Sequence, residues 1–159
     1  MSKIFVDQVE SKTSGGAVTI DSAVTVNNTL TMSDRPAFSM NIGGNASANS
    51  VIVLNAGLNQ GNHVNTSTGV FTAPIAGLYQ FSAYSIKANV NNVVCRLQIR
   101  KGSTILAEAR MDETGLYTQA CCSIIENLVV GDQITFYNGD SYVFYMDGIY
   151  GRCSGYFIG

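Results

Sequence analysis

Residues 71–81 of this chain read FTAPIAGLYQF. Tyr79 and Phe81 are two positions apart, so on a strand their side chains lie on one face and bury a large apolar area there. Gly77, just before them, permits a bulge or the close approach of another backbone where the strand begins. The stretch therefore predicts a strand that starts at residue 77 and places two aromatic side chains on one buried face.

Strand-like runs recur on both sides of this stretch from residue 37 onward, separated by turn signals. No window shows a convincing helical period. Asn138-Gly139-Asp140 and Lys101-Gly102-Ser103 are predicted hairpin turns. The pattern predicts an all-β protein, an antiparallel sandwich of two sheets. The expected strands lie near residues 37–42, 50–54, 69–72, 77–87, 93–100, 103–110, 116–128, 132–138, 142–149 and 153–158.

The spacing within residues 71–81 resembles the signature of the complement C1q-type globular domain, F-x5-G-x-Y-x-F. Further pieces of that family's pattern follow in the right order over residues 35–159, about four-fifths of the chain. They are Arg35-Pro36-Ala37-Phe38-Ser39, Asn65 with Thr68-Gly69-Val70-Phe71, Leu128-Val129-Val130-Gly131-Asp132-Gln133-Ile134 and Ser154-Gly155-Tyr156-Phe157-Ile158. Val53, Val64 and Ala83 depart from the pattern and predict altered packing around them, but they leave the fold prediction unchanged.

The resemblance implies a ten-stranded antiparallel jelly roll, related to tumour necrosis factor, that assembles as a tight homotrimer. It also implies that the matched signature residues lie in the jelly-roll core or at the trimer interface. These residues are Phe71, Gly77, Tyr79, Phe81 and Phe157. Among the other aromatic residues, Tyr142 and Tyr145 are candidates to line the trimer axis or an exposed apex.

Charge is scarce in this chain: 13% of the residues are charged, where about 25% is usual. Residues 36–86 contain no Asp, Glu, Lys or Arg at all. A monomer usually spreads both signs of charge over its surface to stay soluble. We therefore expect part of this stretch to be buried against other copies of the chain. The alternative is a neutral surface rich in Asn, Ser and Gly, as at residues 41–49.

Residues 18–35 contain three hexads, VTIDSA, VTVNNT and LTMSDR, in which two apolar positions alternate with a threonine. Three such short rungs cannot bury a core alone, so we expect the segment to wind around the same segment of other copies as a β-stalk. A single β-hairpin is the alternative. The predicted organisation is an anchoring arm at 1–17, a stalk at 18–35 and a jelly roll at 36–159. The predicted stalk contacts are Val18, Ile20, Val24, Val26, Leu30 and Met32.

The composition argues against several function classes. The net charge of −2 and the pI near 5.2 lack the basic footprint of a nucleic-acid binder, and no apolar run approaches the 18 residues of a membrane span. His63 is the single histidine, so neither a catalytic triad nor an ordinary zinc site is indicated. Asp112 and Glu113 lack an EF-hand pattern. We expect no enzyme activity, no metal and no cofactor.

The four cysteines have no CxxC spacing and are expected to be buried free thiols. The first residues turn polar before an apolar signal segment can form, which favours synthesis in a reducing cytoplasm.

The opening SKIFVDQVESKTSGG, followed by the hexads, is similar to the start of fibre and decoration proteins of tailed bacteriophages. The predicted virion-anchoring residues are Lys3, Ile4, Phe5, Val6 and Val9.

These resemblances together imply a structural protein on the virion surface of a tailed phage, assembled in the host cytoplasm. We expect a trimeric capsid decoration or cement protein that contacts capsid or other virion proteins through residues 1–35 and displays the jelly roll. The first alternative is the tip of a tail or head fibre that binds a host-surface glycan or protein. The second is a secreted C1q-like recognition module without any virus.

Overall fold

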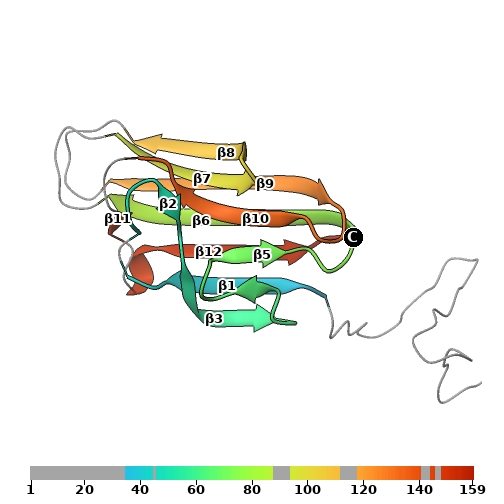
Figure 1. Cartoon of the computed structure of the whole chain (residues 1–159). Helices are drawn as coiled ribbons and strands as arrows, with labels where there is room; N and C mark the ends of the chain where they lie inside the picture. Colours follow the sequence, from blue (N-terminus) through green and yellow to red (C-terminus); the bar gives the residue numbers. More distant parts are fainter. Residues whose placement is uncertain (1–34, 45, 88–93, 112–117, 141–143, 146–147) are drawn as a thin grey trace, which may run out of the picture. The chain divides into compact units, whose positions relative to one another are not determined.

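Two antiparallel β-sheets, packed face to face, make up the folded unit in this computed structural model (Figure 1). The structure describes residues 35–44, 46–87, 94–111, 118–140, 144–145 and 148–159. The chain divides into two units between Met32 and Ser33, and all the described residues belong to the second. The described residues contain strands and one short 3-10 helix, but no α-helix.

The described strands are β1 (Ala37–Ile42), β2 (Ser50–Val51), β3 (Leu54–Gln60), β4 (Val64–Asn65), β5 (Val70–Thr72), β6 (Gly77–Lys87), β7 (Cys95–Lys101), β8 (Thr104–Met111), β9 (Gln119–Leu128), β10 (Gln133–Asn138), β11 (Phe144–Tyr145) and β12 (Arg152–Phe157). The 3-10 helix η1 (Gly148–Tyr150) precedes β12.

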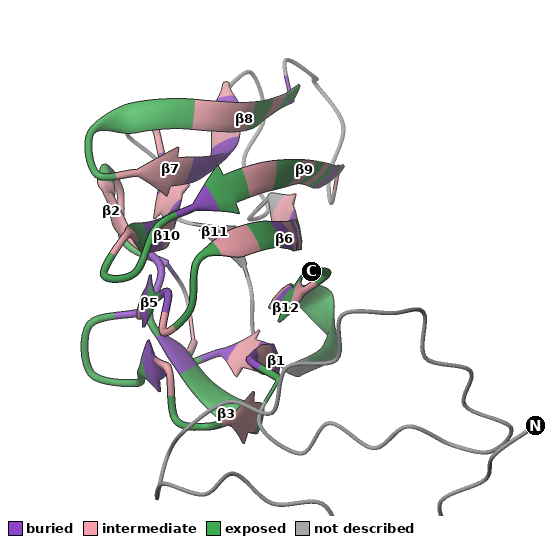
Figure 2. Cartoon of the chain, turned by 90° about the vertical axis from the view of Figure 1, so that its right-hand side faces the viewer, coloured by how far each residue is buried: buried purple, intermediate pink, exposed green. Residues whose placement is uncertain are grey.

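Each sheet combines strands that are far apart in the sequence. Sheet 1 runs β9-β6-β12-β1-β3, with β11 paired to the far end of β6. Sheet 2 runs β4-β5-β10-β7-β8, with β2 also paired to β10. Consecutive strands therefore repeatedly cross between the sheets, which is the connectivity of a jelly roll. Figure 2 shows the two layers nearly edge-on, with the buried residues between them.

A cluster of five aromatic side chains fills the space between the sheets. Phe38, Phe71, Tyr79, Phe81 and Phe136 are each at most 3% exposed. The Phe71 ring centroid lies 5.4 Å from that of Phe38, 5.6 Å from that of Tyr79 and 5.5 Å from that of Phe81. Such tilted and edge-to-face arrangements add to the free energy gained by burying the rings. The cluster joins β1, β6, β5 and β10 and so holds the two sheets together.

Two glycines permit close contacts at this core. A Cβ atom on Gly155 would lie 2.6 Å from ring atoms of both Phe38 and Phe81. The two rings fit against β12 only because residue 155 has no side chain. Gly77 has a φ of 140°, and a Cβ atom on it would lie 2.6 Å from the carbonyl oxygen of Gly159. The amide of Leu78 donates to the same oxygen at 2.7 Å. Gly77 thus allows the last residue to pair with the start of β6.

The amide side chain of Asn59 links the two sheets along one edge. Its Nδ2 donates to the carbonyl oxygen of Val64 at 2.9 Å, and its Oδ1 accepts from the amide of Val64 at 3.1 Å. Asn59 belongs to β3 of sheet 1, whereas Val64 belongs to β4 of sheet 2. The side chain therefore occupies the place of a pairing strand and satisfies backbone groups at the end of a two-residue strand.

The predicted all-β jelly-roll sandwich is confirmed, and the predicted bounds of β1 and β6 match the structure. The count differs, because the described residues form twelve strands rather than ten. The run expected at 50–54 is divided between β2 in sheet 2 and the start of β3 in sheet 1. The rest of β3 has the sequence NAGLNQ, whose composition is not strand-like. It is a strand because the backbone of β1 pairs with it from Ile42 to Ala37.

One of the two predicted hairpins was wrong. Lys101 and Thr104 pair across a two-residue loop in which Gly102 has a φ of 58°, so the β7–β8 hairpin is confirmed. Asn138-Gly139-Asp140 does not join paired strands, because the next strand, β11, pairs with β6 in the opposite sheet. The Asn138 side chain instead accepts from the amide of Asp140 at 3.2 Å, a local turn that ends β10. The strand expected at 142–149 is limited, among the described residues, to β11 and η1.

We predict that Gly77→Ala lowers the free energy of unfolding by about 2–4 kcal/mol, because strain at positive φ adds to a backbone clash. Gly102→Ala is the matched control: Gly102 also has a positive φ, but a Cβ atom there would meet nothing within 4 Å. The control isolates the conformational strain, of about 1–2 kcal/mol. Urea unfolding of both variants measures the difference. If both variants lose the same free energy of unfolding, the close contact with Gly159 does not contribute to the effect of Gly77→Ala.

Candidate functional site: an uncharged sheet face

The outward face of sheet 1 is nearly free of charge. Because Tyr79, Phe81 and Ala83 point into the core, the alternate residues of β6 point outward. The strand register places them beside the outward residues of β9, β12, β1 and β3. Among the described side chains on this face, only that of Arg152 is charged. This surface is called the uncharged face below.

A row of four serines crosses the middle of the uncharged face. Ser123 of β9 pairs with Ser82 of β6, Ser82 with Ser154 of β12, and Ser154 with Ser39 of β1. The hydroxyls of Ser82 and Ser154 lie 2.8 Å apart and share a hydrogen bond. Leu58 of β3 continues the row at the sheet edge. Small hydroxyl side chains keep this part of the face flat and able to hydrogen-bond in either direction.

Apolar side chains surround the serine row. Ile125 is 56% exposed, Leu58 55% and Tyr156 49%. Tyr156 is held in place by its hydroxyl, which donates to Oε1 of Gln80 at 2.6 Å. A hollow of about 360 Å³ lies beside the row, next to Tyr84 and Cys121. Exposed aliphatic and aromatic groups around a flat, neutral centre are typical of a surface that another protein covers.

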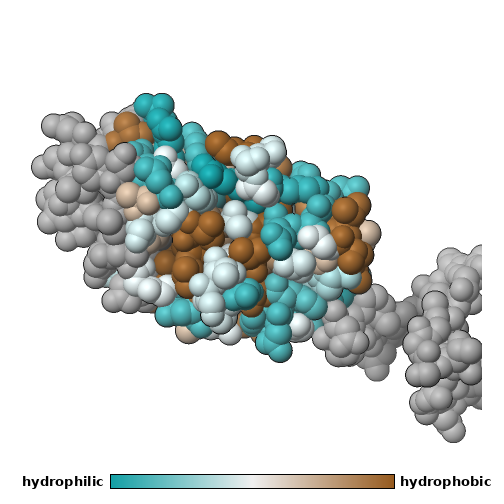
Figure 3. Space-filling model, in the orientation of Figure 1, coloured by the Kyte–Doolittle hydropathy of each residue, from teal (hydrophilic) through white to brown (hydrophobic). Residues whose placement is uncertain are grey.

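The outward face of sheet 2 has the opposite character. It carries charged residues of β7 and β8, including Arg96, Arg100 and Glu108. The guanidinium of Arg100 lies 3.5 Å from the centroid of the Tyr137 ring, and its Nε donates to Oε1 of Gln98 at 2.7 Å. Figure 3, which looks onto this sheet, shows hydrophilic and hydrophobic residues interspersed over it. Such a face is suited to water.

One ion pair stabilises the turn before β10. Nζ of Lys101 lies 2.6 Å from a carboxylate oxygen of Asp132. The hydrogen bond from Lys101 and a second one from the amide of Val129 lower the pKa of Asp132 below its usual value. The carboxylate thus stays charged and fixes the turn that leads from β9 of sheet 1 to β10 of sheet 2.

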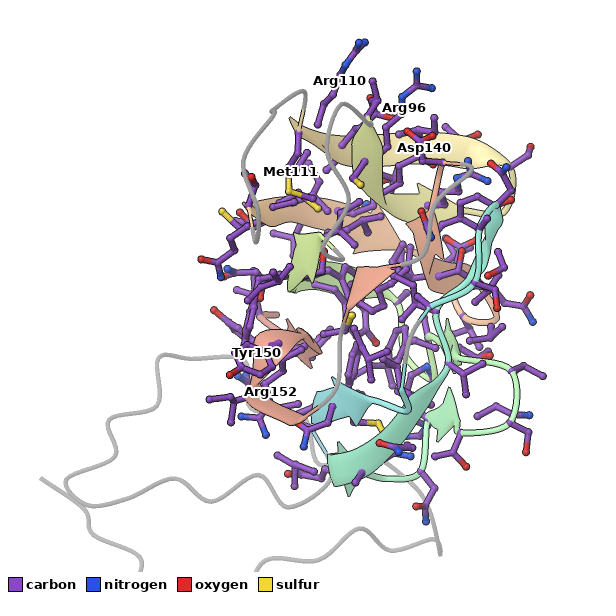
Figure 4. All side chains as sticks on the ribbon, turned by 90° about the vertical axis from the view of Figure 1, so that its left-hand side faces the viewer. Arg96, Arg110, Met111, Asp140, Tyr150 and Arg152 are labelled. Atoms are coloured by element: carbon purple, nitrogen blue, oxygen red, sulfur yellow. The ribbon has the colours of Figure 1, made fainter. Side chains whose placement is uncertain are left out.

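The charged groups at the end of the sandwich away from Gly159 are divided between the two layers (Figure 4). Arg96 and Arg110 are paired directly across β7 and β8 and extend from the corner formed by those strands. Tyr150 and Arg152 lie on the side of sheet 1. Among the described side chains, charge therefore reaches the uncharged face only at this end, through Arg152.

The signature residues predicted from the sequence lie between the sheets rather than on an outward face. Phe71, Tyr79 and Phe81 are enclosed, and Phe157 is half-buried against them, with its ring centroid 5.1 Å from that of Tyr79. Arg35 covers the Phe157 ring, at 5.6 Å from its centroid. The outward residues of sheet 1 were missed as candidates. Their signal in the sequence was the alternation that places them opposite the core positions.

Several predicted residues lie outside the described residues. They are the anchoring residues Lys3, Ile4, Phe5, Val6 and Val9, the stalk residues Val18, Ile20, Val24, Val26, Leu30 and Met32, and the aromatic residue Tyr142. The backbone of Tyr145 belongs to β11.

The four thiols differ in their surroundings, which corrects the expectation that all are buried. Cys95 and Cys153 are buried, Cys122 is half-buried, and Cys121 is exposed on the uncharged face, because neighbouring residues of β9 point to opposite sides. Burial raises the pKa of Cys122 to about 11, with a smaller contribution from the neighbouring Cys121. Burial also raises the pKa of Cys153.

Within the described part of the chain, no three His, Cys, Asp or Glu residues are close enough together to hold a metal ion. In the same part, no helix has the length and apolarity needed to cross a membrane. His63 is half-buried at the edge of sheet 2, and its side chain makes no hydrogen bond to another described residue.

The strand order and the two-layer packing define a jelly roll of the kind shared by complement and tumour-necrosis-factor domains, and comparison with solved structures supports this. The globular domain of zebrafish complement 1qA is 17% identical, with a TM-score of 0.60 over 78% of this chain and 98% of its own. Murine APRIL at pH 5.0 is 9% identical, with a TM-score of 0.63 over 78% of this chain and 99% of its own. Eiger TNF from S. frugiperda is 10% identical, with a TM-score of 0.61 over 79% of this chain and 94% of its own.

Residues 37–158 match the C1q domain family. The chain therefore belongs to that family, as residues 71–81 had indicated. No curated protein matches it significantly in sequence.

We predict that the free energy of unfolding falls as the pH rises from about 9 to 11. The raised pKa values of Cys122, Cys153 and Tyr79 mean that the folded chain holds protons that the unfolded chain has already released in this range. The contribution of these groups to the free energy of unfolding is fully present below their pKa in the unfolded chain. It is lost as the pH rises from that value toward their pKa in the folded chain. Urea unfolding at pH 7.5, 9 and 10.5 measures the slope, which Cys122→Ala should reduce. Cys121→Ala is the control and should keep most of it. An equal slope in both variants would contradict the assignment to Cys122.

Proposed function

We propose that the chain is a non-enzymatic binding and display protein that assembles as a homotrimer through the uncharged face. The observation that carries this proposal is the absence of charge, apart from Arg152, among the described side chains of that face. Moving a charge out of water costs several kcal/mol unless a partner satisfies it. A face without charges avoids that cost when it is covered.

The pattern of polar groups on the face supports burial against further copies. Each serine hydroxyl of the row both donates and accepts, so it can bond to donors or to acceptors of a neighbouring copy. Leu58, Ile125 and Tyr156 are about half exposed and supply apolar area on both sides of the row. The stretch without charge, residues 36–86, contributes β1, β3 and β6 to this face. A three-fold arrangement agrees with the trimer that the family resemblance implies.

We predict that Ser123→Arg prevents this assembly. Ser123 is exposed at the β9 end of the serine row, so an arginine there is solvated in a single subunit but is buried and unpaired in a trimer. Thr104→Arg, at an exposed position of β8 in sheet 2, is the matched control. Light scattering after size exclusion should give three times the 17.0 kDa chain mass for the unaltered chain and for the control, and a single chain for Ser123→Arg.

Two results would overturn the trimer. One is a monomer for the unaltered chain at micromolar concentration, and the other is an unchanged trimer for Ser123→Arg. Labelling with a thiol reagent gives a second reading, because Cys121 lies on the same face. In a trimer Cys121 should be protected, whereas in the Ser123→Arg variant it should react at neutral pH.

We infer further that the protein is a decoration or cement protein on the surface of a tailed phage, anchored through residues 1–35. The similarity of the first residues and hexads to phage fibre and decoration proteins supports this inference. The place of Arg35 supports it as well: its guanidinium donates to the carbonyl oxygen of Ile158 at 3.4 Å. Arg35 therefore lies at the end of the domain that bears Gly159, whereas Arg96 and Arg110 lie at the opposite end.

Two other roles suit the same domain. A fibre tip would use the outward end to bind a host glycan or protein. A secreted C1q-like recognition module without a virus agrees equally well with the family membership.

We predict that purified particles carry the protein in hundreds of copies and that deletion of residues 2–14 abolishes its incorporation. Quantitative mass spectrometry of particles measures both. Particles without the protein should adsorb normally but burst at a lower temperature or at low salt. Normal incorporation of the truncated chain would contradict the anchoring role. A loss of adsorption, with only tens of copies per particle, would favour the fibre tip, and absence from particles would exclude a virion role.

A further inference from the structure

A groove of about 760 Å³ crosses the outward face of sheet 2 beside β4, β5 and β10. Its base consists of outward residues of neighbouring strands: Thr72 pairs with Gln133, and Val70 pairs with Asn65. One wall is formed by Asn62 and the other residues around the turn before β4, and the other by Pro74 and the Val130-Gly131 turn. All these residues belong to one subunit, so the groove does not depend on the proposed trimer.

The lining of the groove is uncharged and offers unused hydrogen-bonding groups. None of its eleven residues is Asp, Glu, Lys or Arg. The side chains of Asn62, His63, Thr68, Thr72 and Gln133 make no hydrogen bond to another described residue. Together they present two amides, two hydroxyls and an imidazole, each of which both donates and accepts.

Apolar groups lie between these polar side chains. Val70 is half-buried in the base, Pro74 is half-buried in the wall, and Val130 is 66% exposed at the rim. A ligand that fits this lining is uncharged and combines many hydroxyls with apolar C–H surfaces. A carboxylate, phosphate or ammonium group would lose its hydration without finding an opposite charge. A purely apolar ligand would leave the amides and hydroxyls unpaired.

The walls of the groove are held in position by hydrogen bonds. Oδ1 of Asn65 accepts from the amides of Ser67 and Thr68 at 2.9 and 3.3 Å. The carbonyl oxygen of His63 accepts from the amide of Thr72 at 2.9 Å, and the amide of Gly131 donates to the carbonyl oxygen of Ala73 at 2.9 Å. The imidazole of His63 lies over Gly61, where a Cβ atom would come within 2.2 Å of Nε2. A groove that is already ordered loses little entropy when a ligand binds.

We propose that this groove is a binding site for neutral saccharides. Saccharide rings present hydroxyls around their edges and C–H groups on their faces, which matches the alternation of amides and hydroxyls with Val70, Pro74 and Val130. The groove lies on the sheet opposite the uncharged face, so it stays open when that face is covered. Several copies on one assembly would bind a repeating polysaccharide with avidity.

The test uses the full chain and a printed panel of neutral oligosaccharides made of glucose, mannose, galactose and N-acetylglucosamine. Heparin and hyaluronan fragments serve as charged probes. Saturation-transfer NMR of the neutral hits should show contact through ring C–H groups. The double variant Thr72→Ala, Gln133→Ala should weaken binding of the best neutral hit at least about tenfold, the loss expected when two hydrogen bonds are removed.

Ser103→Ala with Thr104→Ala is the matched control, because both residues are exposed in the β7–β8 hairpin of sheet 2 and lie outside the groove and the uncharged face. It should leave binding unchanged, and unfolding curves of both double variants should show that they fold. Four results would overturn the proposal: no neutral saccharide binds, binding survives the groove variant, only the charged fragments bind, or an extended peptide from a random library occupies the groove in preference to every saccharide. If the unaltered chain is a monomer and still binds saccharide, that result contradicts the proposed trimer but not the proposed binding site.

Discussion

The packing of five aromatic side chains between two sheets is the constraint on which the other features of this structure depend. Tyr79 and Phe81 are completely enclosed, and Gly155 admits the rings of Phe38 and Phe81 because it has no side chain. Once these residues point inward, the two-residue period of a strand forces Gln80, Ser82 and Tyr84 outward. The antiparallel register then aligns them with β9 and β12. The core thus decides which residues form the uncharged face.

The two outward faces of the sandwich differ in charge because the charged β7–β8 hairpin belongs to sheet 2, although residues 36–86 also supply the short strands β2, β4 and β5 of that sheet. Residues 36–86 contain no charge and supply three strands of sheet 1. The β7–β8 hairpin carries Arg96, Arg100, Lys101, Glu108 and Arg110 and forms one edge of sheet 2. Desolvation is costly for these charged groups and cheap for the serine row. Because of this difference in desolvation cost, the uncharged face is suited to contact with other copies of the chain, whereas the face of the β7–β8 hairpin is suited to water.

Most of the fold followed from sequence patterns, and the exceptions have identifiable causes. The strand at 77–87 was predictable because its aromatic residues alternate strictly. Residues 55–60 have no such alternation, and they form a strand because the edge of β1 is available for pairing. The hairpin at Asn138-Gly139-Asp140 was wrong because the local signal reports a turn but not which strand follows it. The groove could not be predicted, since residues from two separate segments, 62–74 and 130–133, meet there only after sheet 2 has formed.

The sequence by itself determined the class of fold, the positions of the buried aromatic residues and the absence of charge in residues 36–86. These are local properties, carried by alternation, by glycine at positions without room for a side chain, and by composition. Only the tertiary structure decided which uncharged residues share one face, that Cys121 is exposed there while Cys122 is half-buried, and that Asn62, Thr72 and Gln133 line one groove. The reason is that strand register and the crossing of the chain between sheets bring together residues that no local pattern relates.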